Sequence, residues 1–398
     1  MNQMNRVYQF ALGKLHAPSL ARLAAGFVKI MAEGKQLVQA RPGKPISLSD
    51  ADLIACRERL SAIYPQPATV RLAGEMSPEN GMDVSVILPV YNAEACVYAL
   101  LDSLFCQKTE YSFEVIAVDD GSADASGEML EARAKTEPRL KVIRQPNGGA
   151  AAARNAGLDA AGGKYVFFAD ADDLVCPGAI QNMTQLAEQH SLDFVQSAWR
   201  YMDGPIQRLQ DEVLPEGNLL PMVEMPGMPW AKLIRRNLFQ GIRFPEGFNC
   251  FEDSIIKCLL LPRCRRVGLC SCVAYAWLRN NPTGLTATSR FAPKTIQAYW
   301  VVEEMERLSS RSPDLLGLAI LLQQICSVML PRLKLFDDQI RQDAFLLACH
   351  LTERYTTAKD FPSWKKQLPF AHDQALKVIE SRDFHRAEAL SRDWKFLV

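Results

Sequence analysis

The feature that most constrains the fold is a fourfold alternation of apolar runs and helical patterns between residues 83 and 190. The apolar runs, rich in β-branched residues, read VSVILPV, FEVIAVD, LKVIR and YVFF. A segment with helical spacing follows each of them: AEACVYALLDSLFCQ, ADASGEMLEARAKT, GGAAAARNAGLDAA and GAIQNMTQLAEQ. Strand–helix alternation at this spacing predicts an α/β fold with a mostly parallel sheet and helices on both faces.

Polar motifs follow the predicted strands, where sheets of this kind bind ligands. They are PVYN, VDDGS, NGGAAAARN and DADD, and four such strand ends in order are more informative than any one alone. Pro89 ends the first strand, and Tyr91 can offer a flat face to an aromatic base. Asp119 and Asp120 can accept hydrogen bonds from a base or a ribose. The alternative is a plain turn with acids at a helix N-terminus.

The third strand end places two glycines before an alanine-rich helix that contains Arg154. The fixed charge of an arginine suits a phosphate or a carboxylate, and the alternative is an ordinary surface arginine. The pattern is neither GxGxxG nor GxxxxGK[ST], which weighs against dinucleotide and P-loop sites.

The fourth strand end carries the acids Asp170, Asp172 and Asp173. In an extended segment, Asp170 and Asp172 point to one side and Asp173 to the other. Carboxylates that repel one another suit a hard cation such as Mg²⁺ or Mn²⁺, with a diphosphate completing the coordination shell. An acid-rich helix start is the alternative.

A later segment, MPWAKLIRRNLFQGIRFPEGFNCFEDSII, contains Trp230, Lys232, Glu252 and Asp253. The two acids precede an apolar helical pattern. A carboxylate there can cap the helix, or it can act as a general base in the site formed by the strand ends.

Two flanking regions have helical patterns, which divides the chain into residues 1–80, 81–290 and 291–398. Ser47 or Ser49 is a plausible N-cap in the first region. Before residue 46, seven basic residues accompany one acid, Glu33. This segment either packs as a solvated helix face or lies on an anionic membrane surface. The apolar stretch 315–330 is shorter than the ~20 residues of a membrane span and predicts a buried helix.

Composition excludes some functions. The net charge is zero, so no overall basic field directs the chain to nucleic acid. The start of the sequence lacks a secretory pattern, which favours a cytoplasmic protein with reduced thiols among its eleven cysteines. A zinc site at Cys258, Cys264, Cys270 and Cys272 is disfavoured because paired CxxC units are missing.

Together, VSVILPVYNAE, EVIAVDDGSAD, NGGAAAARNAGLDAAGGKYVFFADADD and FEDS resemble the inverting family 2 glycosyltransferases with the GT-A fold. The resemblance covers residues 83–285. It implies a nucleoside-diphosphate-sugar donor, usually UDP-linked, and a divalent cation, Mg²⁺ or Mn²⁺.

The resemblance also implies a role for each matching residue. On the donor side it implies Tyr91 and Pro89 beside the base, Asp120 on the uracil edge, Asp119 supporting that loop, Arg154 near the base or diphosphate, Asp172 on the ribose and Arg279 over the diphosphate. It makes Asp173 the metal ligand, with Asp170 shaping that loop. Asp253 becomes the catalytic base with Glu252 beside it, and Trp230 and Lys232 fall on the acceptor side.

The chain lacks the Q-x-x-R-W motif and the membrane helices of processive members, so the resemblance predicts transfer of a single sugar. The expected acceptor is a glycan or a lipid-linked sugar, with possible peripheral attachment to the inner membrane face. Two other functions remain open: an inactive module that binds a nucleotide sugar or glycan, and a sugar nucleotidyltransferase. The second is disfavoured because LPVYNAEACVY lacks a glycine-rich basic loop.

Overall fold

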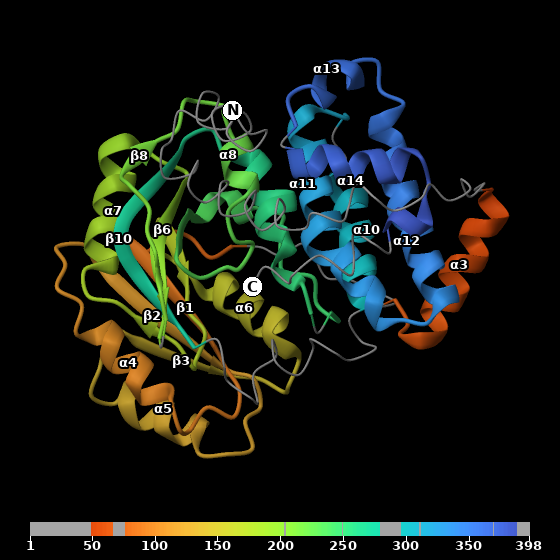
Figure 1. Ribbon diagram of the computed structural model, residues 1–398. Helices are drawn as coiled ribbons and strands as arrows, with labels where there is room; N and C mark the ends of the chain where they lie inside the picture. Colours follow the sequence, from red (N-terminus) through yellow and green to blue (C-terminus); the bar gives the residue numbers. More distant parts are fainter. Residues whose placement is uncertain are drawn as a thin grey trace.

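The computed structural model describes residues 49–66, 76–202, 204–248, 250–278, 296–309, 312–368 and 370–387. One ten-stranded sheet lies in one half of the molecule, and α3 (Asp50–Ile63) and the C-terminal helices form the other half (Figure 1). Its strands are β1 (Val84–Val90), β2 (Phe113–Asp119), β3 (Leu140–Arg144), β4 (Tyr165–Phe168), β5 (Leu174–Val175), β6 (Phe194–Tyr201), β7 (Ile206–Gln207), β8 (Glu212–Val213), β9 (Lys232–Arg235) and β10 (Val267–Trp277).

The strand order is β3-β2-β1-β4-β9-β6-β10-β5, with β7 paired to β6 and β8 to β10. The four strands predicted from the alternation, β1 to β4, run parallel to one another. β9 runs antiparallel to both of its neighbours, β4 and β6, whereas β6 and β10 are parallel. The mostly parallel sheet is therefore confirmed. β9 is a reversed strand within it, and the two-residue strands β5, β7 and β8 are also antiparallel to their partners.

Helices cover both faces of the sheet, and other helices form a group beside it (Figure 1). The helices are α3 (Asp50–Ile63), α4 (Val97–Phe105), α5 (Ser126–Ala134), α6 (Gly149–Ala160), α7 (Ala179–His190), α8 (Leu220–Val223), α10 (Gln297–Ser309), α11 (Leu315–Gln324), α12 (Asp338–Thr356), α13 (Phe361–Lys365) and α14 (Phe370–Glu380). Short 3₁₀ and π turns are η1 (Arg236–Phe239), η2 (Glu252–Ser254), η3 (Ile256–Leu260), η4 (Leu261–Arg263), η6 (Ile325–Met329) and η7 (Leu330–Leu335).

The two faces of the sheet follow from the alternation of side chains along each strand. In β1, Val86 and Leu88 pack with α4, α5 and α7, while Ile87 points to the opposite face and packs with α6. Gly157 of α6 permits this close approach, because a Cβ there would lie 2.4 Å from Ile87 Cγ2.

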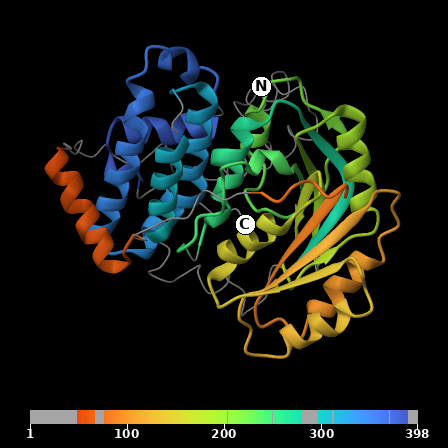
Figure 2. The same cartoon turned by 180° about the vertical axis from the view of Figure 1, so that it is seen from behind.

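The C-terminal helices lie on the α6 side of the sheet in both views (Figures 1 and 2). They share one apolar core with it, since Leu158 of α6 belongs to the same buried cluster as Trp300, Leu322 and Phe345. The predicted buried helix at 315–330 is present as α11 followed by η6, with its apolar side chains mostly buried.

Helix α3 packs against the C-terminal helices, although about 280 residues separate the contacts in sequence. Its N-cap is Ser49, one of the two predicted caps, and a capping box with Asp52 fixes this end. Arg59 donates two hydrogen bonds to the buried carboxylate of Asp343 in α12, at 2.7 and 2.8 Å. Within the described parts of the chain, no helix is long and apolar enough to cross a membrane.

Candidate active site

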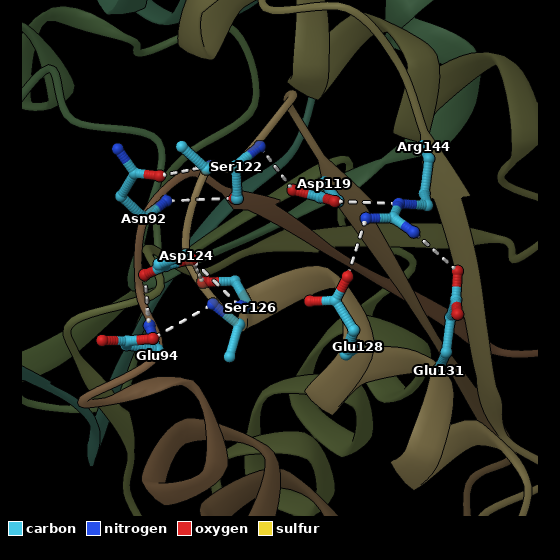
Figure 3. A network of polar contacts seen from close by, with 11 residues as sticks. Asn92, Glu94, Asp119, Ser122, Asp124, Ser126, Glu128, Glu131 and Arg144 are labelled. Atoms are coloured by element: carbon cyan, nitrogen blue, oxygen red, sulfur yellow. Dashed lines mark hydrogen bonds and ion pairs between the residues drawn. The ribbon is translucent and has the colours of Figure 1, made fainter.

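The loops that follow β1 and β2 are held together by reciprocal hydrogen bonds (Figure 3). Asn92 N donates to Ser122 Oγ at 3.0 Å, and Ala123 N donates to Asn92 Oδ1 at 2.8 Å. Glu94 N donates to Asp124 Oδ2 at 3.0 Å. Asn92 has φ +48, a left-handed conformation that asparagine tolerates better than most residues. These bonds fix the backbone beside Tyr91, whose ring is 53% exposed.

Asp119, at the end of β2, anchors the same loop from the side of Arg144 (Figure 3). Its Oδ1 accepts from Ser122 N at 3.0 Å, and its Oδ2 accepts from Arg144 Nε at 3.2 Å. Gly127 packs against this pair without a side chain, because a Cβ would lie 2.6 Å from Asp119 Oδ2. We call the residues labelled in this view the strand-end network: Asn92, Glu94, Asp119, Ser122, Asp124, Ser126, Glu128, Glu131 and Arg144.

Asp120 joins the second strand end to the third. Its carboxylate accepts from the backbone N–H groups of Gly148 and Gly149, both at 2.8 Å, and from Gln145 Nε2 at 2.7 Å. These glycines lie at the N-terminus of α6, where a negative charge is favourable. Asp120 is 3% exposed, and in this conformation its carboxylate holds the loop between β3 and α6 in place. Its predicted contact with uracil stays a prediction.

Arg154 links the third and fourth strand ends to the later acids. It is 5% exposed, so it is not the ordinary surface arginine of the alternative interpretation. Nη2 donates to Asp170 Oδ1 at 3.0 Å, and Nη1 donates to Glu252 Oε1 at 2.7 Å. The guanidinium also lies 5.5 Å from the centre of the Phe244 ring. The fold thus brings together four of the residues that the sequence singled out: Arg154, Asp170, Glu252 and Asp253.

Tyr275, in β10, holds the loop that carries Asp170, Asp172 and Asp173, which we call the acidic loop, and the sequence did not predict this contact. Its hydroxyl donates to Asp173 Oδ2 at 2.8 Å and accepts from Asp170 N at 2.9 Å. Leu278 N donates to Asp173 Oδ1 at 2.7 Å. Burial, followed by the charges of Asp170 and Asp172, raises the pKa of Asp173 to about 8. The signal in the sequence was a hydroxyl-bearing ring in an otherwise apolar strand, VAYAW.

Trp230 lies beside this loop within an aromatic cluster. It stacks on Tyr275 with ring centres 5.0 Å apart and planes within 3°, and it also contacts Trp199 and Trp277. The side chain is 2% exposed, so in this conformation it packs under the loop. Its predicted place on the acceptor side stays a prediction.

Asp253 has different surroundings from the other acids. It follows Glu252 in η2 and, among the described residues, no hydrogen bond reaches its carboxylate. Burial and the neighbouring Glu252 raise its pKa to about 7, although Arg154 and Lys232 act in the opposite direction. A carboxyl group with a pKa near neutrality is suited to accept a proton.

Two buried lysines accompany Asp253. Burial lowers the pKa of Lys232 to about 7 and that of Lys257 to about 8. Lys232 is 1% exposed and donates a long hydrogen bond, 3.4 Å, to Trp230 O, while Lys257 donates to Val223 O at 2.9 Å. Sequence reasoning missed Lys257, although a lone lysine four residues after Asp253 in SIIKCLLL was a signal. We call Arg154, Asp170, Lys232, Glu252, Asp253 and Lys257 the base cluster.

Two of the predictions concern residues that the structure does not describe, and others concern the cysteines and a bound metal ion. Arg279 and the basic segment before residue 46 lie outside the described ranges. The eleven cysteines are free thiols, and six of them are buried. Across the described ranges, no group of three or more His, Cys, Asp or Glu side chains is arranged to hold a metal ion.

Comparisons with known proteins agree with the fold and with the positions of these motifs. Residues 85–257 match the model of glycosyl transferase family 2. An uncharacterized glycosyltransferase of Bacillus subtilis, EpsJ, is 36% identical over 51% of this chain and 62% of its own length. The poly(ribitol-phosphate) β-N-acetylglucosaminyltransferase TarS of Staphylococcus aureus is 30% identical over 49% of this chain and 35% of its own. The aligned part is thus less than two thirds of each relative.

The structure of residues 1–349 of that Staphylococcus aureus protein, in complex with UDP-GlcNAc, superposes with a TM-score of 0.62. The superposition covers 78% of this chain and 92% of the other at 21% sequence identity. At this identity the superposition shows that the two folds are similar. Residues 85–257 of this chain are thus similar to glycosyl transferase family 2, and the fold is of the GT-A type, as the resemblance predicted.

Proposed function

We propose that the chain is an inverting, non-processive glycosyltransferase. It moves one sugar from a nucleoside-diphosphate sugar, with a UDP-linked donor as the first candidate, to a hydroxyl acceptor in cell-surface polysaccharide or glycolipid synthesis. The observation that carries the proposal is the environment of Asp253: a carboxyl group with a pKa of about 7 that interacts with Asp170, just after β4, and with Lys232, at the start of β9.

In this mechanism Asp253 takes the proton of the acceptor hydroxyl as the oxygen forms its bond to the anomeric carbon. The bond to the nucleoside diphosphate breaks on the opposite face, so the configuration inverts without a covalent intermediate. Lys232 and Arg154 keep part of the Asp253 population ionised at neutral pH, because their charges lower its pKa against the effect of burial. General base catalysis of this kind contributes roughly 10²–10⁴ in rate.

The donor is assigned to the strand-end network and the acidic loop. Tyr91 offers an exposed ring to the base, beside Pro89, and Asp172 is placed on the ribose. One relative, the Staphylococcus aureus protein, supports both a UDP-linked donor and a polymeric acceptor. One structure contains UDP-GlcNAc, and the corresponding protein is named for transfer to poly(ribitol phosphate).

The acidic loop suits a divalent cation. Its carboxylates are hard oxygen ligands, and the raised pKa of Asp173 shows that burial and the charges of Asp170 and Asp172 are only partly offset by the surrounding groups. Asp173 and Asp170 would hold the ion. When bound, Mg²⁺ or Mn²⁺ would neutralise charge that develops on the leaving diphosphate.

The test is a nucleotide-release screen of the wild-type protein against UDP-, GDP- and dTDP-sugars, with Mg²⁺, with Mn²⁺ and with EDTA. We expect release from one nucleotide class and transfer to an added glycan or lipid-linked acceptor. Tight UDP binding without turnover over a broad panel would favour an inactive binding module instead. Pyrophosphate released from a nucleoside triphosphate and a sugar phosphate would favour a nucleotidyltransferase.

Peripheral attachment to a membrane is a separate proposal, motivated by the basic residues before position 46. Co-sedimentation with anionic vesicles at low salt tests it, because electrostatic attachment is strongest there. No binding under that condition would remove it.

A further inference from the structure

The two residues that flank Glu252 and Asp253 are held by the C-terminal helices. On one side, the guanidinium carbon of Arg332 lies 4.2 Å from the centre of the Phe251 ring. On the other side, Ser254 Oγ donates to Gln324 Oε1 at 3.4 Å in a buried environment. Arg332 and Gln324 belong to η7 and α11, outside residues 85–257 that match the family.

The backbone of Phe251 needs such support. It has φ +66 and ψ 15, a left-handed conformation that is uncommon for a bulky aromatic residue and persists only where the surroundings fix it. This residue immediately precedes η2, so its conformation decides where the chain places Glu252 and Asp253.

Arg332 is itself fixed, which makes it an effective anchor. It is 8% exposed, and its Nη1 donates to the carbonyls of Ser327 and Val328 in the preceding turn. A cation over the face of an aromatic ring is attractive, and more strongly so when both groups are removed from water.

We propose that Arg332 and Gln324 are positioning residues that hold Asp253 for the transfer step, by fixing Phe251 and Ser254 on either side of it. This inference rests on the proposed function. It gives the C-terminal helical region a role in catalysis, because this region supplies the two side chains that hold the residues on either side of the base. The donor-binding loops lie in other elements and do not depend on it.

The test compares Arg332→Met, Arg332→Lys and Gln324→Leu with the matched control Arg307→Met. Arg307 lies in α10 with a side chain that is 66% exposed, and within the described part of the chain its ion pair is with Glu304. With the donor that the wild-type protein turns over, we expect Arg332→Met to lower kcat about 10–100-fold, the scale of a small misplacement of a catalytic group. KM for the donor and the affinity for UDP should be unchanged. Arg332→Lys should restore most of kcat because it keeps the cation, and Arg307→Met should match the wild type.

A double-mutant cycle with Phe251→Leu separates positioning from general destabilisation. If the contact is the cause, the double variant should be no slower than the slower single variant, since both remove the same interaction. Hydrogen exchange provides a readout independent of activity: amides of residues 251–257 should exchange faster in Arg332→Met, while those of β2 keep the wild-type rate.

The outcomes distinguish this inference from the proposed function. If the wild-type protein turns over no donor, the proposed function is wrong. The contact between Arg332 and Phe251 then has no role in catalysis either. An active wild type whose Arg332→Met variant keeps its kcat overturns the positioning inference alone. Independent, multiplying effects in the cycle, or faster exchange throughout the molecule, would also overturn it.

Discussion

Carboxylates in two neighbouring regions of this molecule meet opposite environments. In the strand-end network and beside it, Asp119 and Asp120 accept five hydrogen bonds between them, from backbone amides, Arg144 and Gln145. In the base cluster, Asp253 accepts none from the described residues and lies near two buried lysines. Hydrogen bonds to an ionised carboxylate stabilise it and fix a loop, whereas burial without them raises the pKa and leaves the oxygen free to take a proton.

The difference explains how one site can both bind and react. The loops beside Tyr91 are ordered before any ligand arrives, so little conformational entropy is lost when a flat base binds there. The base cluster instead keeps a carboxyl group and an amine, each with a pKa near 7, close enough for the charge of each to shift the pKa of the other, an arrangement typical of proton transfer.

The substitution Asp253→Asn is the most direct test of the difference between Asp253 and the hydrogen-bonded acids Asp119 and Asp120. We expect transfer to fall by roughly 10²–10⁴, because the amide cannot accept the proton, with donor binding retained. Rates of transfer and the affinity for UDP measure the two properties. The control is Asp338→Asn, whose side chain is 89% exposed, and it should behave as wild type. Transfer by the Asp253→Asn variant at the wild-type rate would show that another group is the base.

The pH profile tests the same residue without mutation. Asp253 acts as a base only when ionised, so kcat/KM should rise with pH up to about 7 and fall about tenfold per unit below that. Steady-state rates between pH 5 and 9 give the midpoint. A flat profile across this range would contradict a base with a pKa of about 7.

The same chemical change should alter stability with opposite signs in the two regions. Asp120→Asn should lower the free energy of unfolding by about 1–3 kcal/mol, because one amide oxygen cannot replace the carboxylate that accepts from two backbone N–H groups. Asp253→Asn should raise it at pH 8. The folded state holds the Asp253 proton up to about pH 7, whereas the unfolded chain loses it near pH 4, so ionised Asp253 destabilises the fold as pH rises through this interval.

Denaturant unfolding at pH 8 and pH 4.5 measures both variants. The gain from Asp253→Asn should be full above about pH 7 and should shrink as the pH falls toward 4, because the folded wild-type side chain is then neutral as well. If both variants lose stability equally at pH 8, the contrast between the two regions is wrong.

The smallest effect is expected in the loops of the strand-end network. Asn92→Ala removes the acceptor for Ala123 N and places alanine at φ +48, so we expect a loss of about 1 kcal/mol and a several-fold weaker affinity for UDP. Asn92→Gly is the matched control, since it removes the same acceptor but accepts the backbone conformation. The difference between the two variants in calorimetry reports the strain alone. Equal UDP affinity in Asn92→Ala and wild type would remove the proposed role of this loop.

Sequence patterns were enough for the local elements of the fold. The four apolar runs became β1 to β4, and the segments between and after them became α4 to α7. The position of Arg154 one turn into α6, and of the acids after β4, followed from the same pattern. These predictions succeeded because strand and helix periodicity are local properties, with the spacing of apolar residues set by 2.0 and 3.6 residues per repeat.

Other features depended on contacts that no local pattern contains. The antiparallel direction of β9, the hydroxyl of Tyr275 on Asp173, and Lys257 beside Asp253 were not predicted. The bonds from Arg154 to Asp170 and to Glu252 join residues 16 and 98 positions apart.

The sequence by itself determined the alternating architecture and placed the candidate residues at the strand ends, because those depend on spacing and residue type. Only the tertiary structure decided which carboxylates are satisfied and which one is left to react. Hydrogen bonding and burial set the proton affinity of a carboxyl group, and both depend on what the whole chain brings around it. For Asp253, that includes the C-terminal helices, whose contacts with Phe251 and Ser254 become visible only when the chain is folded.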